Sequence, residues 1–93
     1  MLPANEIVAV VTGANRGIGF EISRQLARRG VRVCLTARDA DLGAAAVDKL
    51  IREGLPVFFQ TLDVTDGPMI ERLADVLEKQ FGRLDVLVNN AGI

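Results

Sequence analysis

The 93-residue sequence contains no histidine, no tryptophan and no tyrosine, and its only cysteine is Cys34. A single cysteine excludes a disulfide framework within the chain. Cys34 is the only thiol in a chain without histidine and stands inside an apolar run, so we expect a buried structural thiol and no transition-metal site. Without tyrosine, the chain also has no phenol that could serve as a general acid.

An excess of one charge and a long apolar run are also missing. Eleven basic and twelve acidic residues give a net charge of −1, which offers no reason to expect nucleic acid or a membrane surface as a partner. No apolar run reaches the roughly 20 residues of a membrane-spanning helix, and residues 1–6 do not resemble a signal peptide. We therefore expect a globular α/β protein of the cytosol.

What the sequence does contain is an alternation of short apolar runs and amphipathic stretches. The runs predict strands at 7–11, 31–36, 55–62 and 84–88. Helical periodicity predicts a helix beginning at residue 16 or 17 and ending near residue 29, a second over 39–53, and a third from about 68 to 81. The residues expected on the buried faces of the first two helices are Ile18, Ile22, Leu26, Leu42, Ala46 and Leu50.

Four strands separated by three helices predict parallel βαβ units, that is, a Rossmann-like sheet forming an incomplete doubly wound fold. Right-handed crossovers favour the strand order 3-2-1-4, although 2-1-3-4 obeys the same rules. No linker or low-complexity segment divides the chain, so residues 1–93 are expected to form one domain.

A glycine-rich turn stands between the first strand and the first helix, with glycines at Gly13, Gly17 and Gly19. In this context Gly13 allows a sharp turn, Gly17 leaves room for a pyrophosphate near the backbone, and Gly19 allows close packing of the helix on the strand. The amide groups at the helix N-terminus would face the anion. A glycine triplet alone is also compatible with a simple tight turn.

Four motifs together resemble the short-chain dehydrogenase/reductase family: residues 12–19 (TGANRGIG), 35–39 (LTARD), 62–65 (LDVT) and 89–92 (NNAG). They occur in the family's usual order and cover essentially the whole chain. Within the family, the sequence is most similar to NADPH-dependent carbonyl reductases and related plant ketone reductases. The resemblance implies a Rossmann-type domain that binds NADP(H).

The resemblance also implies how NADP(H) is distinguished from NAD(H). Ala37 stands where NAD-dependent members carry an acidic residue, which leaves room for a 2′-phosphate. The guanidinium of Arg38 would pair with that phosphate, and Arg16 would add a second positive charge. The alternatives are that Arg38 and Arg16 are simply solvated surface residues.

Two further motifs are implied to border the cofactor. Asp63 and Val64 resemble the pair beside the adenine ring, although Asp63 could instead cap the following helix. The motif ending in Asn90, Ala91 and Gly92 would steady the sheet as well as touch the cofactor. The full set of predicted cofactor-binding residues is Gly13, Asn15, Arg16, Gly17, Ile18, Gly19, Arg38, Asp63, Val64, Asn90, Ala91 and Gly92.

The family's catalytic Ser and Tyr-x-x-x-Lys have no counterpart in this sequence, so no catalytic residue is predicted. We expect the N-terminal, cofactor-binding part of an NADPH-dependent carbonyl or ketone reductase, whose carbonyl substrate binds only in a full-length form. The alternative is a non-catalytic nucleotide-binding module or one half of a split enzyme. The expected fourth strand, 84–88, would lie at a sheet edge and promote self-association or pairing with a missing C-terminal half.

Overall fold

The computed structural model describes residues 7–63, 65–82 and 85–88. The described chain alternates strand and helix in the order β1 (Val8–Val11), α1 (Gly17–Arg28), β2 (Arg32–Ala37), α2 (Ala40–Arg52), β3 (Val57–Thr61), α3 (Gly67–Phe81) and β4 (Val86–Val88). The predicted helices are confirmed to within about two residues at each end, the usual uncertainty of helix boundaries.

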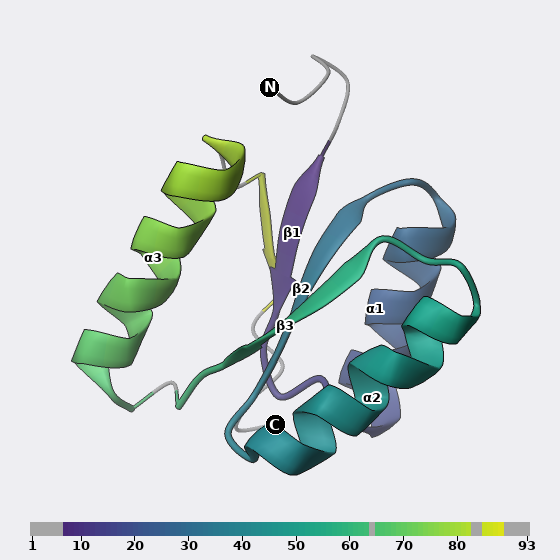
Figure 1. Ribbon diagram of the computed structural model, residues 1–93, viewed down its shortest axis with the longest axis horizontal. Coiled ribbons are helices and arrows are strands. Elements are labelled where there is room, and N and C mark those ends of the chain that lie inside the picture. The colour runs from purple at the N-terminus through teal and green to yellow at the C-terminus, as the bar shows by residue number, and fades with distance from the viewer. Residues whose placement is uncertain (1–6, 64, 83–84, 89–93) are drawn as a thin grey trace.

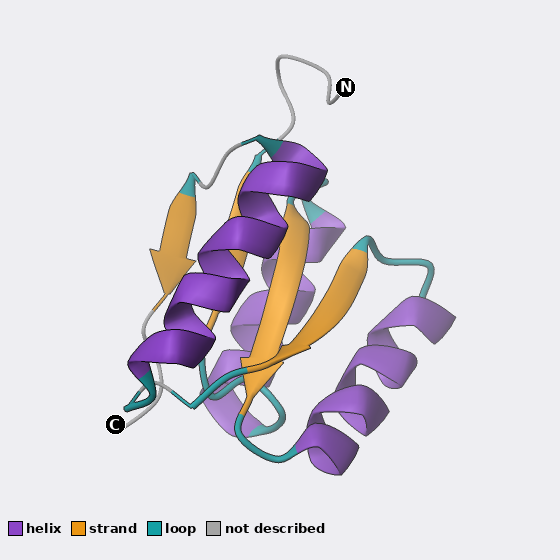
Figure 2. Ribbon diagram, turned by 60° about the vertical axis from the view of Figure 1, so that its left-hand side comes forward, coloured by secondary structure: helices purple, strands orange, loops and turns teal. Residues whose placement is uncertain are grey.

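The strands are parallel and form one sheet in the order β3-β2-β1-β4. In the register of this sheet, Val10 lies beside Cys34 on β2, and Cys34 lies beside Phe58 on β3. Helices α1 and α2 cover one face of the sheet, and α3 covers the other (Figures 1 and 2). The predicted α/β class, with parallel strands and three helices in a Rossmann-like arrangement, is confirmed.

Helices α2 and α3 begin and end at residues that favour those positions. The carboxylates of Asp39 and Asp66 accept hydrogen bonds from the amides of Leu42 and Met69, and each thereby caps its helix. Gly82 ends α3 with φ of 70°, a left-handed conformation that glycine adopts without steric strain. The sheet is thus connected by helices whose ends are fixed locally.

Two hydrophobic clusters lie on the two faces of the sheet. On the α1/α2 face the buried residues are Ala9, Val11, Ala14, Ala27, Val31, Val33, Leu35, Ala46, Val47, Leu50 and Val57. On the α3 face they are Val8, Val10, Cys34, Leu62, Leu73 and Leu77. Alternate residues of β1 belong to opposite clusters, as expected for a strand buried on both faces.

The predicted buried faces of α1 and α2 are partly wrong. Ile18 is 70% exposed and Leu42 is 56% exposed. Ala46 and Leu50 are buried as predicted, and Ile22 and Leu26 are half-buried. The buried residues that were not predicted are Gly19, Ser23 and Ala27 on α1, and Gly43 and Val47 on α2. Small side chains let a helix lie close to the sheet, and a Cβ on Gly43 would collide with the Phe59 ring.

Cys34 is buried and unpaired in the α3-face cluster, as the sequence predicts. Burial raises the pKa of its thiol to about 12, so the group stays protonated and unreactive at neutral pH. None of the helices within the described ranges is both long enough and apolar enough to cross a membrane.

Candidate functional site

The glycine turn between β1 and α1 has the backbone conformation that its sequence predicts. Gly13 and Gly17 have φ of 58° and 64°, values that other residues rarely adopt. A Cβ on Gly17 would meet no protein atom within 4 Å, so the turn is open to the outside at this residue. Helix α1 starts after Arg16, whose side chain makes no capping hydrogen bond. Its first amide groups are therefore not satisfied by a local side-chain cap.

The predicted residues of the turn differ in how far they are exposed. Arg16, Gly17 and Ile18 are exposed, whereas Gly13 and Asn15 are half-buried. Gly19 is buried, and its carbonyl accepts a 2.9 Å hydrogen bond from the Ser23 hydroxyl. The exposed part of the turn is thus the part where an anion would approach the helix N-terminus.

The end of β2 carries an exposed positive charge, Arg38, beside this turn. Ala37 is 1% exposed, whereas Arg38 is exposed. The neighbouring acid, Asp39, accepts a 2.9 Å hydrogen bond from the Leu42 amide and is occupied as the cap of α2. The exposed guanidinium of Arg38 lies beside this cap at the end of β2.

Asp63 follows β3, and its side chain stabilises a short turn. Its Oδ1 accepts hydrogen bonds from the amide and the hydroxyl of Thr65, at 2.9 and 2.6 Å. The Thr65 hydrogen bonds, with a smaller contribution from the positive charge of Arg38, lower the pKa of Asp63. Because Asp66 caps α3, Asp63 is not the cap of that helix. A stable carboxylate therefore follows β3, within the electrostatic reach of Arg38.

The parallel sheet brings these segments together at the carboxyl-terminal end of its strands. The glycine turn follows β1, Arg38 follows β2 and Asp63 follows β3, and the carboxyl ends of parallel strands lie together. Across β1, the Thr12 amide donates a 3.0 Å hydrogen bond to the Val88 carbonyl at the end of β4. The remaining predicted site residues, Val64, Asn90, Ala91 and Gly92, lie outside the described residues.

Thr36 lies in the LTARD motif, but the sequence analysis assigned it no role. It links two segments at the carboxyl-terminal end of the sheet. Its hydroxyl donates to the Val11 carbonyl at 3.0 Å, and its own carbonyl accepts from the Ala14 amide at 2.9 Å. Thr36 is fully buried. A hydroxyl directly after the apolar residues 33–35 was the only signal in the sequence that could have revealed it.

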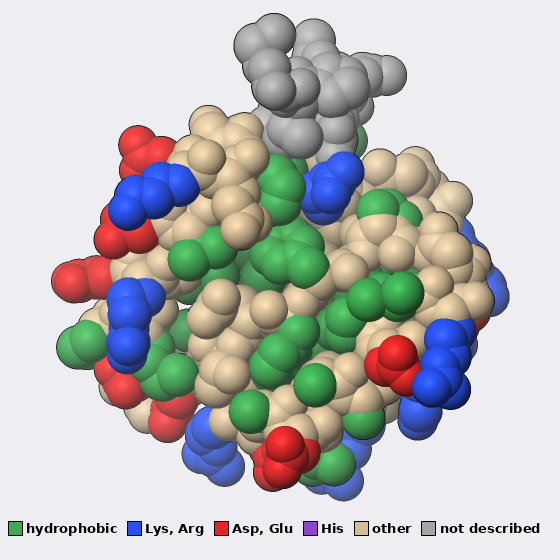
Figure 3. Space-filling model, in the orientation of Figure 1, with side chains coloured by type: hydrophobic (Ala, Val, Ile, Leu, Met, Phe, Trp, Pro, Cys, Tyr) green, Lys and Arg blue, Asp and Glu red, His purple; other side chains and the backbone are tan. Residues whose placement is uncertain are grey.

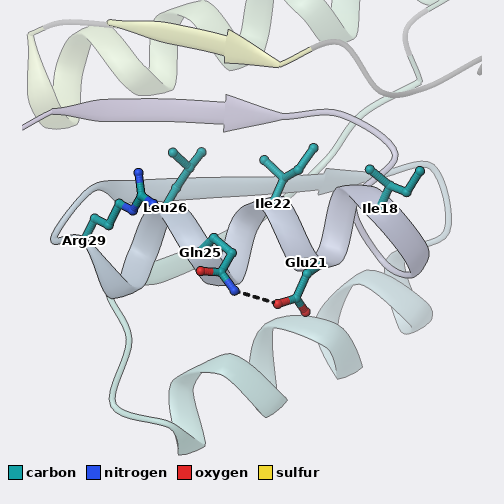
Figure 4. A pocket seen from close by; sticks show the side chains of 6 residues that line it. All are labelled: Ile18, Glu21, Ile22, Gln25, Leu26 and Arg29. Carbon is teal, nitrogen blue, oxygen red and sulfur yellow. Dashed lines mark hydrogen bonds between the residues drawn. The ribbon is translucent and has the colours of Figure 1, made fainter.

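A pocket runs along α1, to one side of the glycine turn. Ile18, Ile22 and Leu26 form one row on the side of the helix turned away from α2 (Figure 4). Glu21, Gln25 and Arg29 complete the lining. The hydrogen bond from Gln25 lowers the pKa of Glu21, so this rim keeps its negative charge at neutral pH. The pocket shares only Ile18 with the predicted cofactor residues.

Known proteins match this chain over nearly its whole length. It is 56% identical over 89 residues to (+)-neomenthol dehydrogenase of Arabidopsis thaliana, covering 91% of this chain and 30% of that protein. It is 54% identical over 93 residues to carbonyl reductase [NADPH] 1 of Bos taurus, covering 99% of this chain and 34% of that protein. The chain thus spans about a third of the length of these relatives.

A solved structure agrees with these sequence matches. The menthone neomenthol reductase from Mentha piperita superposes with a TM-score of 0.91 at 48% identity, over 97% of this chain and 33% of that one. The model of the short chain dehydrogenase family matches residues 7–93. The chain therefore belongs to the short-chain dehydrogenase family.

Proposed function

We propose that this chain is the part of an NADPH-dependent oxidoreductase that binds the adenosine and pyrophosphate side of NADP(H). The observation that carries the proposal is the exposed Arg38 beside the buried Ala37, next to the open glycine turn. A site for NAD(H) would place an acid close to the ribose, at the position where this chain has Ala37; Asp39, two residues further on, caps α2 through its Oδ1. The relationship to carbonyl reductase [NADPH] 1 supports the same cofactor.

The proposed contacts follow from the positions of the side chains. The amide groups that begin α1 face the pyrophosphate, with the turn formed by Gly13, Asn15, Gly17, Ile18 and Gly19. Arg38 pairs with the 2′-phosphate, and Arg16, exposed in the turn, adds positive charge.

The later residues are assigned to the adenine and to the part of the cofactor beyond β4. Asp63 accepts a hydrogen bond from the exocyclic amine of the adenine through the oxygen that Thr65 leaves free, and Val64 borders the ring. Asn90, Ala91 and Gly92 border the cofactor where β4 ends.

NADPH supplies the hydride in this chemistry, and the protein binds and orients it. The whole protein would reduce a ketone or an aldehyde, as the names of its relatives suggest. Reduction of a carbonyl also needs an acid that protonates the oxygen. We propose no residue of this tyrosine-free sequence for that role, and we expect residues 1–93 alone to bind the cofactor without turning it over. A cytosolic location stays a prediction from the sequence.

The test is the change Arg38→Ala, followed by titration with NADPH and NADH and read by nicotinamide fluorescence. A charge-assisted hydrogen bond contributes about 1.5–3 kcal/mol, so the unmodified chain should prefer NADPH by roughly ten- to a hundredfold. The variant should lose most of that preference while its affinity for NADH stays the same.

The matched control is Arg72→Ala, which removes the same charge from an exposed position on α3. It should leave the preference for NADPH intact, which separates a specific contact from a change in net charge. Equal affinities of the unmodified chain for NADPH and NADH would contradict the proposal.

We also propose that residues 1–93 by themselves associate through β4. This strand pairs with β1 and lies at the edge of the sheet. An edge strand presents backbone groups that can pair with another chain, and residues 86–88 contain neither lysine nor proline to prevent it. Pairing of β4 with β4 of a second copy would give a two-fold dimer with a continuous sheet.

A further inference from the structure

Thr36 is a buried hydroxyl residue at the junction of two binding elements. It stands on β2 directly before Ala37 and Arg38, and it is fully buried. Among the described residues, the only other buried polar side chains are Thr12 and Ser23. A polar group inside a packed sheet destabilises the fold unless it is hydrogen-bonded, so its partners indicate why it is there.

Two polar groups of Thr36, the side-chain hydroxyl and the main-chain carbonyl, form hydrogen bonds at the glycine turn. The side-chain hydroxyl donates to the carbonyl of Val11, the last residue of β1 before the turn, at 3.0 Å. The main-chain carbonyl accepts from the amide of Ala14 inside the turn, at 2.9 Å. Ala14 itself is fully buried. Thr36 is therefore hydrogen-bonded to the chain on both sides of Gly13.

These two hydrogen bonds of Thr36 lie between the two proposed phosphate contacts. The pyrophosphate contact begins at Gly17, three residues beyond Ala14, and the 2′-phosphate contact is Arg38, two residues beyond Thr36. The adenosine part of the cofactor is a compact ligand that must reach both contacts at once. Its affinity therefore depends on the distance between the turn and the end of β2.

We propose that Thr36 is a positioning residue that sets the spacing between the pyrophosphate-binding turn and the 2′-phosphate-binding Arg38. The inference rests on the proposed function, because it assumes that one ligand bridges both places. It differs from a simple packing role in one respect. Loss of the Thr36 hydroxyl should harm ligands with two phosphates more than ligands with one.

The experiment uses Thr36→Val, which keeps the branched shape and removes the hydroxyl. The probes are adenosine 2′,5′-bisphosphate, which reaches both contacts, and 2′-AMP and 5′-AMP, which each reach one. Since one hydrogen bond contributes about 0.5–1.5 kcal/mol, affinity for the bisphosphate should fall about two- to tenfold. Affinity for each monophosphate should change much less, and Thr36→Ser should restore bisphosphate binding.

The control for general loss of stability is Val47→Ala, a truncation in the α1/α2-face cluster that touches neither hydrogen bond of Thr36. It should weaken the fold without changing the advantage of the bisphosphate over the monophosphates. Equal losses for all three ligands in Thr36→Val, or no loss for the bisphosphate, would overturn the positioning role.

Amide hydrogen exchange gives a second readout that needs no ligand. In the unmodified chain the Ala14 amide should be protected about as well as the Val33 amide, which donates to the Pro56 carbonyl elsewhere in the sheet. Thr36→Val keeps the main-chain carbonyl that accepts from Ala14 but removes the hydroxyl bond to Val11 beside the turn. We therefore expect Ala14 to exchange faster as the turn loosens, while Val33 keeps its protection. If Thr36→Val does not fold, rapid exchange of Ala14 in the unmodified chain still overturns the inference. If the unmodified chain binds none of the three nucleotides, the proposed function fails. The exchange rate of the Ala14 amide then still tests whether Thr36 holds the turn in place.

Discussion

The two faces of the sheet differ in how many residues they bury. The α1/α2 face has a cluster of eleven buried residues, and the α3 face has six, counted over the described residues. Two helices cover the first face and one helix covers the second (Figure 2). In the space-filling view, hydrophobic side chains gather between α3 and the strands (Figure 3). The α3 face is the thinner half of the core.

The proposed binding site is built on the thicker half. Ala14, in the middle of the glycine turn, belongs to the α1/α2-face cluster. Glu53, which follows α2, also forms ion pairs with Arg24 and Arg28 of α1, at 3.1 and 3.2 Å. Exposed pairs of this kind contribute little energy each, but here they join two helices of the same layer. The glycine turn therefore packs with the α1/α2 side of the sheet.

The largest predicted effect compares a leucine truncation on each face. Leu50 is 0% exposed in the α1/α2-face cluster, and Leu73 is 6% exposed in the α3-face cluster. Buried Leu→Ala changes lower the free energy of unfolding by about 2–5 kcal/mol, depending on how tightly the site is packed. We expect Leu50→Ala near the upper end and Leu73→Ala near the lower end, measured by urea unfolding.

The control for this comparison is Ile51→Ala, because Ile51 lies next to Leu50 on α2 and is 53% exposed. It should change the unfolding free energy by less than about 1 kcal/mol. A loss from Leu73→Ala as large as that from Leu50→Ala would show that the two faces are packed equally well.

Periodicity in the sequence predicted the elements well and their orientation less well. Leu42 and Gly43 are adjacent on α2, and hydrophobicity alone chose Leu42 for the core. The structure buries Gly43 because the Phe59 ring occupies the space where a side chain would extend. Such a close approach depends on a residue far away in sequence, so no local pattern could have predicted it.

The candidate site shows the same division. The positive φ angles of Gly13 and Gly17 follow from local turn chemistry, and the sequence anticipated a turn there. The hydrogen bonds of Thr36 to the turn join segments more than twenty residues apart, and they depend on the register between β1 and β2. The cofactor roles assigned to the site residues stay predictions until a ligand is titrated.

Cys34 offers a smaller test that is specific to the α3 face. Its pKa in the folded chain is raised by burial to about 12 from an ordinary value of 9.0. Above about pH 9 the unfolded chain loses the thiol proton while the folded chain keeps it. The stabilisation is complete below pH 9 and is lost progressively as the pH rises toward 12, by about 1.4 kcal/mol per unit.

The measurement is the unfolding free energy against pH for the unmodified chain and for Cys34→Val. Both profiles contain the titration of lysines and acids, so only their difference reports the thiol. The difference should be flat up to pH 9 and should then change in favour of the variant. Parallel profiles up to pH 11 would mean that the α3 face admits water to Cys34.

The smallest expected effect concerns β4, the edge strand beside β1. A lysine in an edge strand opposes pairing with another strand, so Val86→Lys should shift any dimer of residues 1–93 toward monomer. Sedimentation velocity at several concentrations measures the shift. Ile51→Lys places the same charge on the exposed side of α2 and should leave the distribution unchanged. A monomer at every concentration before substitution would refute association through β4.

The N-termini of the three helices differ in a way that bears on where an anion can bind. Each helix has a macrodipole whose positive end attracts negative charge. In α2 and α3 that end already holds an anion of the chain itself, the carboxylate of Asp39 or Asp66. An external phosphate would have to compete with these tethered carboxylates. Among the described residues, α1 has no capping carboxylate, so a phosphate approaching its N-terminus would not compete with a side-chain cap.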